Sequence, residues 1–111
     1  MSEFTDYLEE LFSEFGNVYA KRMFGGYGLF YDGLMFALVA DDTLYLKADD
    51  KTVDDFKTRG LQQFEYSKRG KPARMSYYMA PEAILEDPEE AVKWARRSYE
   101  AALRQKNKTC I

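Results

Sequence analysis

Pairs of turn-forming residues divide one apolar stretch of the chain, residues 18–48, into short runs rich in Tyr, Phe, Leu and Val. Asp32-Gly33 separates the first run from residues 34–39, and Asp-Gly readily forms the type I′ turn of a two-residue β-hairpin. Asp41-Asp42 separates the second run from residues 43–47. Such runs are typical of antiparallel strands, so we expect three in succession. The second run is apolar on both faces, which predicts that its strand is central.

A helix is predicted before these strands, because five apolar residues recur at helical spacing and fall on one stripe: Phe4, Leu8, Leu11, Phe12 and Phe15. Ser2 is a suitable N-cap, and Gly16-Asn17 supplies a C-terminal stop. We therefore expect a helix over residues 2–15.

The chain after residue 48 predicts a short helix and a second hairpin. Asp49-Asp50 can cap an amphipathic helix that ends at Gly60. Two β-like runs follow, at residues 64–66 and 75–79, and they flank a basic loop over residues 67–74.

Two further helices are predicted at the end of the chain. Pro81 fits the first turn of a brief helix through Leu85. Asp87-Pro88-Glu89-Glu90 combines an N-cap, a proline at the first helical position and a capping glutamate, so the last helix begins there. We expect that helix to fray after Arg104.

Together these elements predict an α+β fold. We expect one antiparallel sheet of about five strands with helices on one face, in the order α-β(3)-α-β(2)-α. The 111 residues are too few for a second core, so residues 1–111 should form a single domain. The apolar content of 46% and aromatic content of 16% are those of a folded chain.

Several classes of function are disfavoured by the composition. The chain has no histidine, which excludes imidazole as base, nucleophile partner or metal ligand, and its single cysteine, Cys110, cannot form an internal disulfide. The acidic pairs are explained by turns and helix caps, so we expect no metal site, no cofactor and no catalytic residues. No apolar run approaches the roughly 18 residues of a membrane span, and no signal peptide is evident, so we expect a cytoplasmic protein.

A glycine-rich segment, residues 21–30, contains Gly25, Gly26 and Gly28. A phosphate-binding loop needs glycines followed by a helix, but here a strand and an Asp-Gly turn follow. The preferred interpretation is a bulge or kink where glycine relieves crowding and bends the first strand over the sheet.

Cations cluster in the expected hairpin loop, and Lys21-Arg22 adds two more earlier in the chain. The candidate binding residues are Arg22, Lys68, Arg69, Lys71 and Arg74. With neighbouring tyrosines they could hold single-stranded nucleic acid, with weak and salt-dependent affinity. The alternatives are a solvated hairpin loop and a protein-docking site.

The aromatic surplus predicts an interface. If helices cover one face of the sheet, its other face carries large side chains from the set Tyr27, Tyr45, Tyr66 and Tyr77. Uncovered aromatic patches usually mark interfaces, so we expect a homodimer or another protein partner.

Three stretches together resemble the N-terminal domain of the TfoX/Sxy family of competence regulators. They are Met23-Phe24-Gly25-Gly26-Tyr27-Gly28-Leu29-Phe30 with the Asp32-Gly33 hairpin, then Leu44-Tyr45-Leu46-Lys47, then Tyr77-Tyr78-Met79-Ala80-Pro81-Glu82 with Trp94-Ala95. The resemblance covers nearly the whole chain and implies a secretion-chaperone-like fold.

The resemblance also implies a role in regulating genes for DNA uptake, together with the cyclic-AMP receptor protein at promoters. Longer members carry a second, helical domain, whereas we expect this chain to correspond to the N-terminal domain alone. We therefore expect a non-enzymatic regulator that acts by protein–protein contacts, with transcription machinery as the partner. The alternatives are a small nucleic-acid- or ligand-binding module that uses residues 68–74, and an uncharacterised enzyme.

Overall fold

A computed structural model describes residues 2–23 and 25–109 of the chain. In order, the elements are α1 (Glu3–Leu11), β1 (Tyr19–Met23), β2 (Gly26–Tyr31), β3 (Leu34–Ala40), β4 (Thr43–Lys47), α2 (Val53–Lys57), β5 (Gln63–Lys68), β6 (Lys71–Met79), the 3-10 helix η1 (Glu82–Glu86) and α3 (Pro88–Thr109). Within the described residues, none of the helices is both long and apolar enough to span a bilayer.

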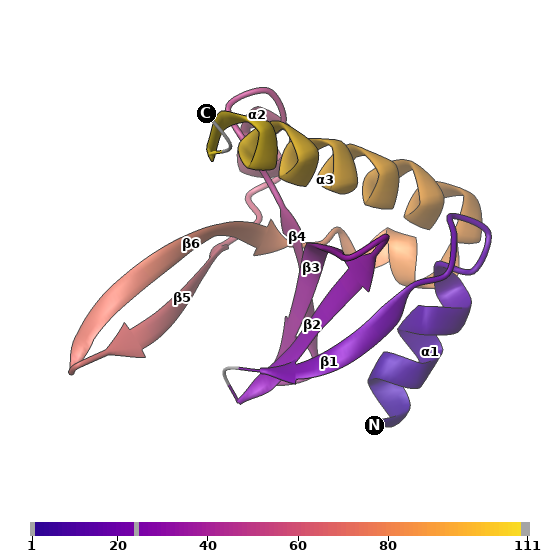
Figure 1. Ribbon diagram of the computed structural model, residues 1–111, viewed down its shortest axis with the longest axis horizontal. Coiled ribbons are helices and arrows are strands. Elements are labelled where there is room, and N and C mark those ends of the chain that lie inside the picture. The colour runs from indigo at the N-terminus through magenta and orange to yellow at the C-terminus, as the bar shows by residue number, and fades with distance from the viewer. Residues whose placement is uncertain (1, 24, 110–111) are drawn as a thin grey trace.

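The strands form one antiparallel sheet of six strands in the order β1-β2-β3-β4-β6-β5. Figure 1 shows that β5 and β6 curve away from the other strands as a long hairpin, while α3 runs across the ends of the strands. The predicted α+β class with one antiparallel sheet is confirmed. The sheet has six strands rather than about five, because the expected first strand is two strands.

The correction concerns the glycine-rich segment, which is a hairpin rather than a kinked strand. Met23 pairs with Gly26, so the chain reverses between β1 and β2, and Gly25 has a φ of +76° that favours glycine. A Cβ on Gly26 would lie 2.1 Å from the carbonyl oxygen of Val39, so only glycine fits there without movement. Phe24 lies outside the described residues. The observed order is therefore α-β(4)-α-β(2)-α.

A bulge does occur in this region, between β2 and β3. Leu29 pairs with Ala37, but Phe30 pairs with Met35, which leaves Phe36 as an extra residue in β3. Phe36 is fully buried, and its ring contacts that of Phe12 at a centroid distance of 5.7 Å. The bulge thus directs a large side chain into the core.

The predicted first helix is confirmed but ends at Leu11 rather than Phe15. Ser2 and Thr5 form a capping box at its start, as expected for a serine N-cap. Residues 12–15 turn instead, because Phe15 leaves the helical stripe to contact the ring of Tyr31 at 4.7 Å.

The last helix begins at Pro88 as predicted, with the Asp87 carboxylate accepting bonds from the backbone N–H groups of Glu89 and Glu90. It continues to Thr109, beyond the expected end at Arg104. Two hydrogen bonds from the Arg104 side chain to Asp49 fasten this part of α3, which explains why fraying does not begin there.

One face of the sheet is covered by the helices. A row of paired residues crosses five strands on that face: Ala20, Leu29, Ala37, Leu46 and Tyr78. All are buried in one cluster together with Leu8 and Phe12 of the α1 region and Trp94 of α3. The expected packing of helices on one face is therefore observed, and this row forms the middle of the core.

Candidate protein-binding surface

The opposite side of the sheet carries the adjacent row of residues, because successive side chains of a strand point to opposite faces. This row is Lys21, Gly28, Leu38, Tyr45 and Met79, each paired with the next across the strands. The same parity adds the paired residues Phe30 and Met35, the paired residues Lys47 and Tyr77, and Met23. We call this surface the open face.

The middle of the open face is a hollow filled by flexible side chains. A Cβ on Gly28 would lie 2.6 Å from the sulfur of Met23, 2.7 Å from that of Met35 and 3.0 Å from the ring of Phe30. Glycine therefore lets two thioethers and a ring close over β2. Methionine adapts its shape readily and recurs on surfaces that accept varied partners.

Aromatic rings extend this surface towards both edges of the sheet. Tyr19 stacks on Phe30 at 5.6 Å, and Tyr19 is 40% exposed. At the other edge Tyr45 contacts Phe64 at 5.0 Å, and Phe64 stacks on Tyr66 at 6.2 Å. The rings thus form two groups, one on β1 and β2 and the other on β4 and β5.

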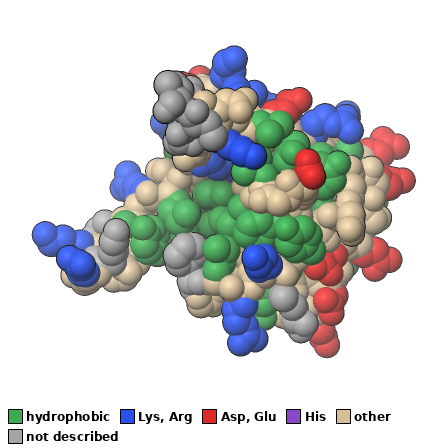
Figure 2. All heavy atoms as spheres, in the orientation of Figure 1, with side chains coloured by type: hydrophobic (Ala, Val, Ile, Leu, Met, Phe, Trp, Pro, Cys, Tyr) green, Lys and Arg blue, Asp and Glu red, His purple; other side chains and the backbone are tan. Residues whose placement is uncertain are grey.

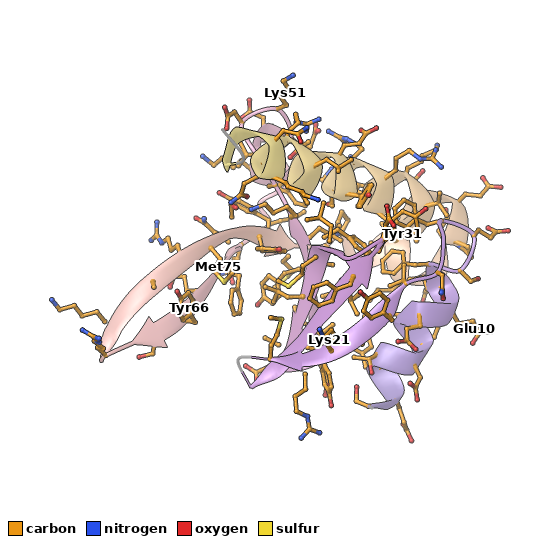
Figure 3. All side chains as sticks on the ribbon, in the orientation of Figure 1. Glu10, Lys21, Tyr31, Lys51, Tyr66 and Met75 are labelled. Atoms are coloured by element: carbon orange, nitrogen blue, oxygen red, sulfur yellow. The ribbon has the colours of Figure 1, made fainter. Side chains whose placement is uncertain are left out.

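The β5–β6 hairpin gives this surface a concave shape. Figure 2 shows hydrophobic side chains in the depression between the hairpin and the rest of the molecule. Most of the acidic side chains visible in that view lie at the other end of the molecule, away from the hairpin. Met75 lies on the inner side of the hairpin, facing that depression (Figure 3). A partner seated there would contact the sheet and the hairpin together.

Two lysines bring positive charge to the open face, and each ammonium lies over an aromatic ring. The Lys21 Nζ is 5.5 Å from the centre of Phe30, and the Lys47 Nζ is 5.1 Å from the centre of Tyr77. Burial lowers the pKa of Lys47, against the opposing charge of Asp49. Burial also raises the pKa of Tyr77 to about 12, and its hydroxyl donates a bond to the Met35 carbonyl at 3.4 Å.

One aromatic residue expected on the open face lies elsewhere. Tyr27 pairs with Val39 and points to the side of the helices, where it packs against the core. The expectation was wrong for this residue because Tyr27 precedes Gly28, which lies on the open face, and therefore shares the other side of β2 with Leu29. Tyr45 and Tyr77 do lie on the open face, as expected, and Tyr66 stacks on Phe64 next to Tyr45.

The predicted basic loop of residues 67–74 is two strands joined by a two-residue turn. Lys68 pairs with Lys71, and the turn residues Arg69 and Gly70 have φ values of +54° and +77°. Arg74 lies within β6, where it forms an ion pair with Glu65 at 2.8 Å. Lys71 and Arg69 are exposed at the tip, and the side chain of Lys68 lies outside the described part of the chain.

Of the five candidate binding residues, Arg22 lies apart from the other four, which belong to the β5–β6 hairpin. Arg22 lies on β1, where its guanidinium is 6.0 Å from the ring centre of Tyr27, and the hairpin tip projects away from β1 (Figure 1). Lys47 and Met35, which are not among the predicted site residues, belong to the open face. No local pattern marks them, since their position depends on which strands become neighbours.

The acidic pairs have structural surroundings. Asp41 and Asp42 occupy a turn with φ values of +50° and +55°, and Asp49 binds Arg104. Among residues 2–23 and 25–109, no three acidic or cysteine side chains gather as a metal ion would need.

Comparison with known proteins gives one family and two relatives. The family model of the TfoX N-terminal domain matches residues 10–102. Protein Sxy of Escherichia coli (strain K12) is 27% identical over 99 residues, which cover 89% of this chain and 47% of Sxy. The DNA transformation protein TfoX1 of Aliivibrio fischeri (strain ATCC 700601 / ES114) is 33% identical over 86 residues, which cover 74% of this chain and 41% of TfoX1. The chain thus spans less than half the length of each relative.

Proposed function

Since this chain belongs to the TfoX N-terminal domain family, we propose that it is a non-enzymatic, cytoplasmic regulator of competence that binds a protein of the transcription machinery on its open face. The description of one relative as a DNA transformation protein supports the biological context. The observation that supports the mode of action is the concave, apolar open face, which α3 reaches only at the edge near Met35, Lys47 and Tyr77.

The composition of the open face favours a protein surface as its ligand. Its rings and thioethers offer a large contact area with few hydrogen-bonding groups, as in the centre of protein interfaces. Leu38 on β3 is only 4% exposed, and it lines a small pocket together with Met23 and Phe64. The rings and thioethers of the open face can rearrange around a partner without disturbing the core on the other side of the sheet.

The charges of the open face favour an acidic partner over a second copy of the chain. The rows that define it carry Lys21 and Lys47 and no carboxylate. A two-fold dimer built on this face would bring the same cations towards each other, and like charges at an interface are unfavourable. We therefore propose that the partner presents an apolar segment flanked by Asp or Glu, and that a homodimer does not use this face.

Site-specific photo-crosslinking tests the proposal. A photoreactive amino acid at position 45, in the middle of the open face, should capture one protein in the native cells, whereas the same group at Tyr7, exposed on α1, should not. The purified captured protein should then bind the wild type and Tyr7→Glu equally, and bind Tyr45→Glu at least tenfold more weakly. Equal binding of the two variants would rule out the open face, and unchanged transcript levels of DNA-uptake genes after deletion of this chain would rule out the regulatory role.

A second candidate function is weak nucleic-acid binding at the hairpin tip. Arg69 and Lys71 are exposed there, but Arg74 is already paired with Glu65, so few cations remain for phosphate. We expect fluorescence polarisation of labelled single-stranded DNA at low salt to respond weakly, and Arg69→Glu to abolish the response. No response from the wild type would dispose of this alternative.

A further inference from the structure

A pocket of about 340 Å³ lies where the last turns of α3 meet the open face. Its apolar walls include Leu34, Met35, Met75, Tyr77 and Ala102, and Lys47 lines it as well. Volumes of roughly 300–1,000 Å³ are those of small-molecule sites, which are mostly apolar with a few placed polar groups. The pocket therefore has the size and the lining of a site for a small ligand.

Lys47 is the polar group that distinguishes this pocket. The residue is only 6% exposed, yet within the described part of the chain its ammonium has no carboxylate within ion-pair distance. It donates to the Ser76 hydroxyl at 2.5 Å and lies over the ring of Tyr77. Asp49, whose charge acts on Lys47, is held by Arg104 at 2.5 Å.

Burying an ammonium is costly unless it is paired. An ammonium has three N–H donors, and the Ser76 hydroxyl accepts one of them. A carboxylate in the pocket could accept a hydrogen bond from a second N–H of Lys47 and balance its positive charge. Binding would therefore offset the free-energy cost of burying the ammonium.

The walls determine which anion suits the site. Phosphate or sulfate would lose strong hydration against thioethers and a tyrosine ring, whereas the chain of an organic acid would replace water there favourably. Met35 and Met75 are flexible and can adjust to the shape of such a chain. Lys106, which also lines the pocket, adds a second positive charge on the side of α3.

We propose that this pocket binds a small carboxylic acid, with the carboxylate at Lys47 and the aliphatic or aromatic chain between Met35, Met75 and Tyr77. The site lies at the edge of the open face beneath α3 and shares Lys47, Met35 and Tyr77 with it. The test below uses no protein partner, so its outcome does not depend on the function proposed above. A bound acid would join α3 to the β6 side of the sheet.

NMR of the full chain labelled with ¹³C in its methionine methyl groups tests this site directly. The probes are octanoate, octan-1-ol and octylammonium, which share one chain and differ in the head group. Octanoate should shift the signals of Met35 and Met75 in a saturable way and leave Met79 on β6 as an internal reference. Octanol should bind at least tenfold more weakly, and octylammonium should not bind.

The variant Lys47→Met removes the charge and keeps a long apolar side chain. It should reduce the affinity for octanoate at least tenfold, to that of octanol, while the matched variant Lys21→Met should leave it unchanged. Equal affinity of the wild type for octanoate and octanol, or no saturable shift of Met35 and Met75, would overturn the proposal without reliance on any variant. Unchanged octanoate affinity in folded Lys47→Met would overturn it as well.

Discussion

The ion pair between Asp49 and Arg104 should stabilise the fold by an amount that depends on pH. The carboxylate of Asp49, two residues after the end of β4, accepts bonds from Arg104 Nε at 2.5 Å and from its Nη2 at 3.1 Å. Asp49 Oδ1 also accepts a bond from the backbone N–H of Lys51 at 3.1 Å. The hydrogen bonds from Arg104 outweigh the opposing effect of burial and lower the pKa of Asp49 from 3.8 to about 2.

We propose Asp49→Asn as the perturbation, because asparagine keeps a side-chain oxygen for Lys51 and removes the charge. One pKa unit corresponds to about 1.4 kcal/mol, so the lowered pKa corresponds to at most about 2.5 kcal/mol. The Arg104 side chain is 31% exposed, and solvent screening weakens the pair. We therefore expect the variant to lose about 1–2 kcal/mol of unfolding free energy at pH 7.

The sign of the pH dependence follows from the lowered pKa. Since Asp49 is more acidic in the folded chain than in the unfolded chain, its contribution is complete above about pH 5 and disappears as the pH falls towards 2. The difference between the wild type and Asp49→Asn should therefore shrink between pH 5 and pH 3. Urea unfolding followed by the fluorescence of the single tryptophan, Trp94, measures it at each pH.

Asp42→Asn provides the matched control, because Asp42 is exposed in a turn whose φ of +55° asparagine also adopts. That variant should change the unfolding free energy by less than about 0.5 kcal/mol at every pH. The reasoning is refuted if Asp49→Asn costs no more than Asp42→Asn at pH 7, or if its cost is the same at pH 7 and pH 3.

Three further predictions concern the sheet and the core. Gly26→Ala should lower the free energy of unfolding by about 3 kcal/mol, because the new Cβ would lie 2.1 Å from a backbone carbonyl oxygen. Gly28→Ala should lower it by only about 1 kcal/mol, because its Cβ would meet methionine sulfurs that can move. Equal losses for the two variants in urea unfolding would contradict this. Trp94→Ala should lower the free energy of unfolding by about 3–5 kcal/mol, because Trp94 is 6% exposed and its ring centroid lies 5.3 Å from that of Phe56. An unchanged melting temperature by circular dichroism would contradict this prediction. Burial raises the pKa of Tyr77 to about 12, so its contribution to stability is complete below about pH 10 and disappears as the pH rises to 12. Over that range Tyr77→Phe should lose less stability than the wild type. Parallel pH profiles of the two proteins would contradict this prediction.

The parts of the fold that could be predicted are those set by neighbouring residues. Asp32-Gly33 forms the expected hairpin turn, with φ values of +52° and +79°, because this dipeptide suits left-handed geometry. Asp87 caps α3 through its own carboxylate within three residues. In both cases the chemistry that determines the structure lies in adjacent residues, so the sequence alone was sufficient.

The parts that could not be predicted depend on unusual turns or on distant contacts. The turn before Gly26 lacks an Asn-Gly or Asp-Gly pair, and at the tip of the second hairpin an arginine, Arg69, takes the left-handed conformation. Neither signal is strong enough to place a turn. The pairing of Asp49 with Arg104 spans 55 positions, and the assignment of Tyr27 to one face required the strand register. The residues of the candidate site become neighbours only through the pairing of strands, so no local pattern predicts them.

Every methionine after Met1 lies on or beside the open face: Met23, Met35, Met75 and Met79. Oxidants convert a thioether to a sulfoxide, which is polar and chiral. Because these four side chains lie opposite the helix-covered core, sulfoxides there would alter what the surface can bind while leaving the core packing in place. Material handled in air can thus keep its circular-dichroism spectrum and melting temperature and yet lose binding, and methionine sulfoxide reductase would restore it.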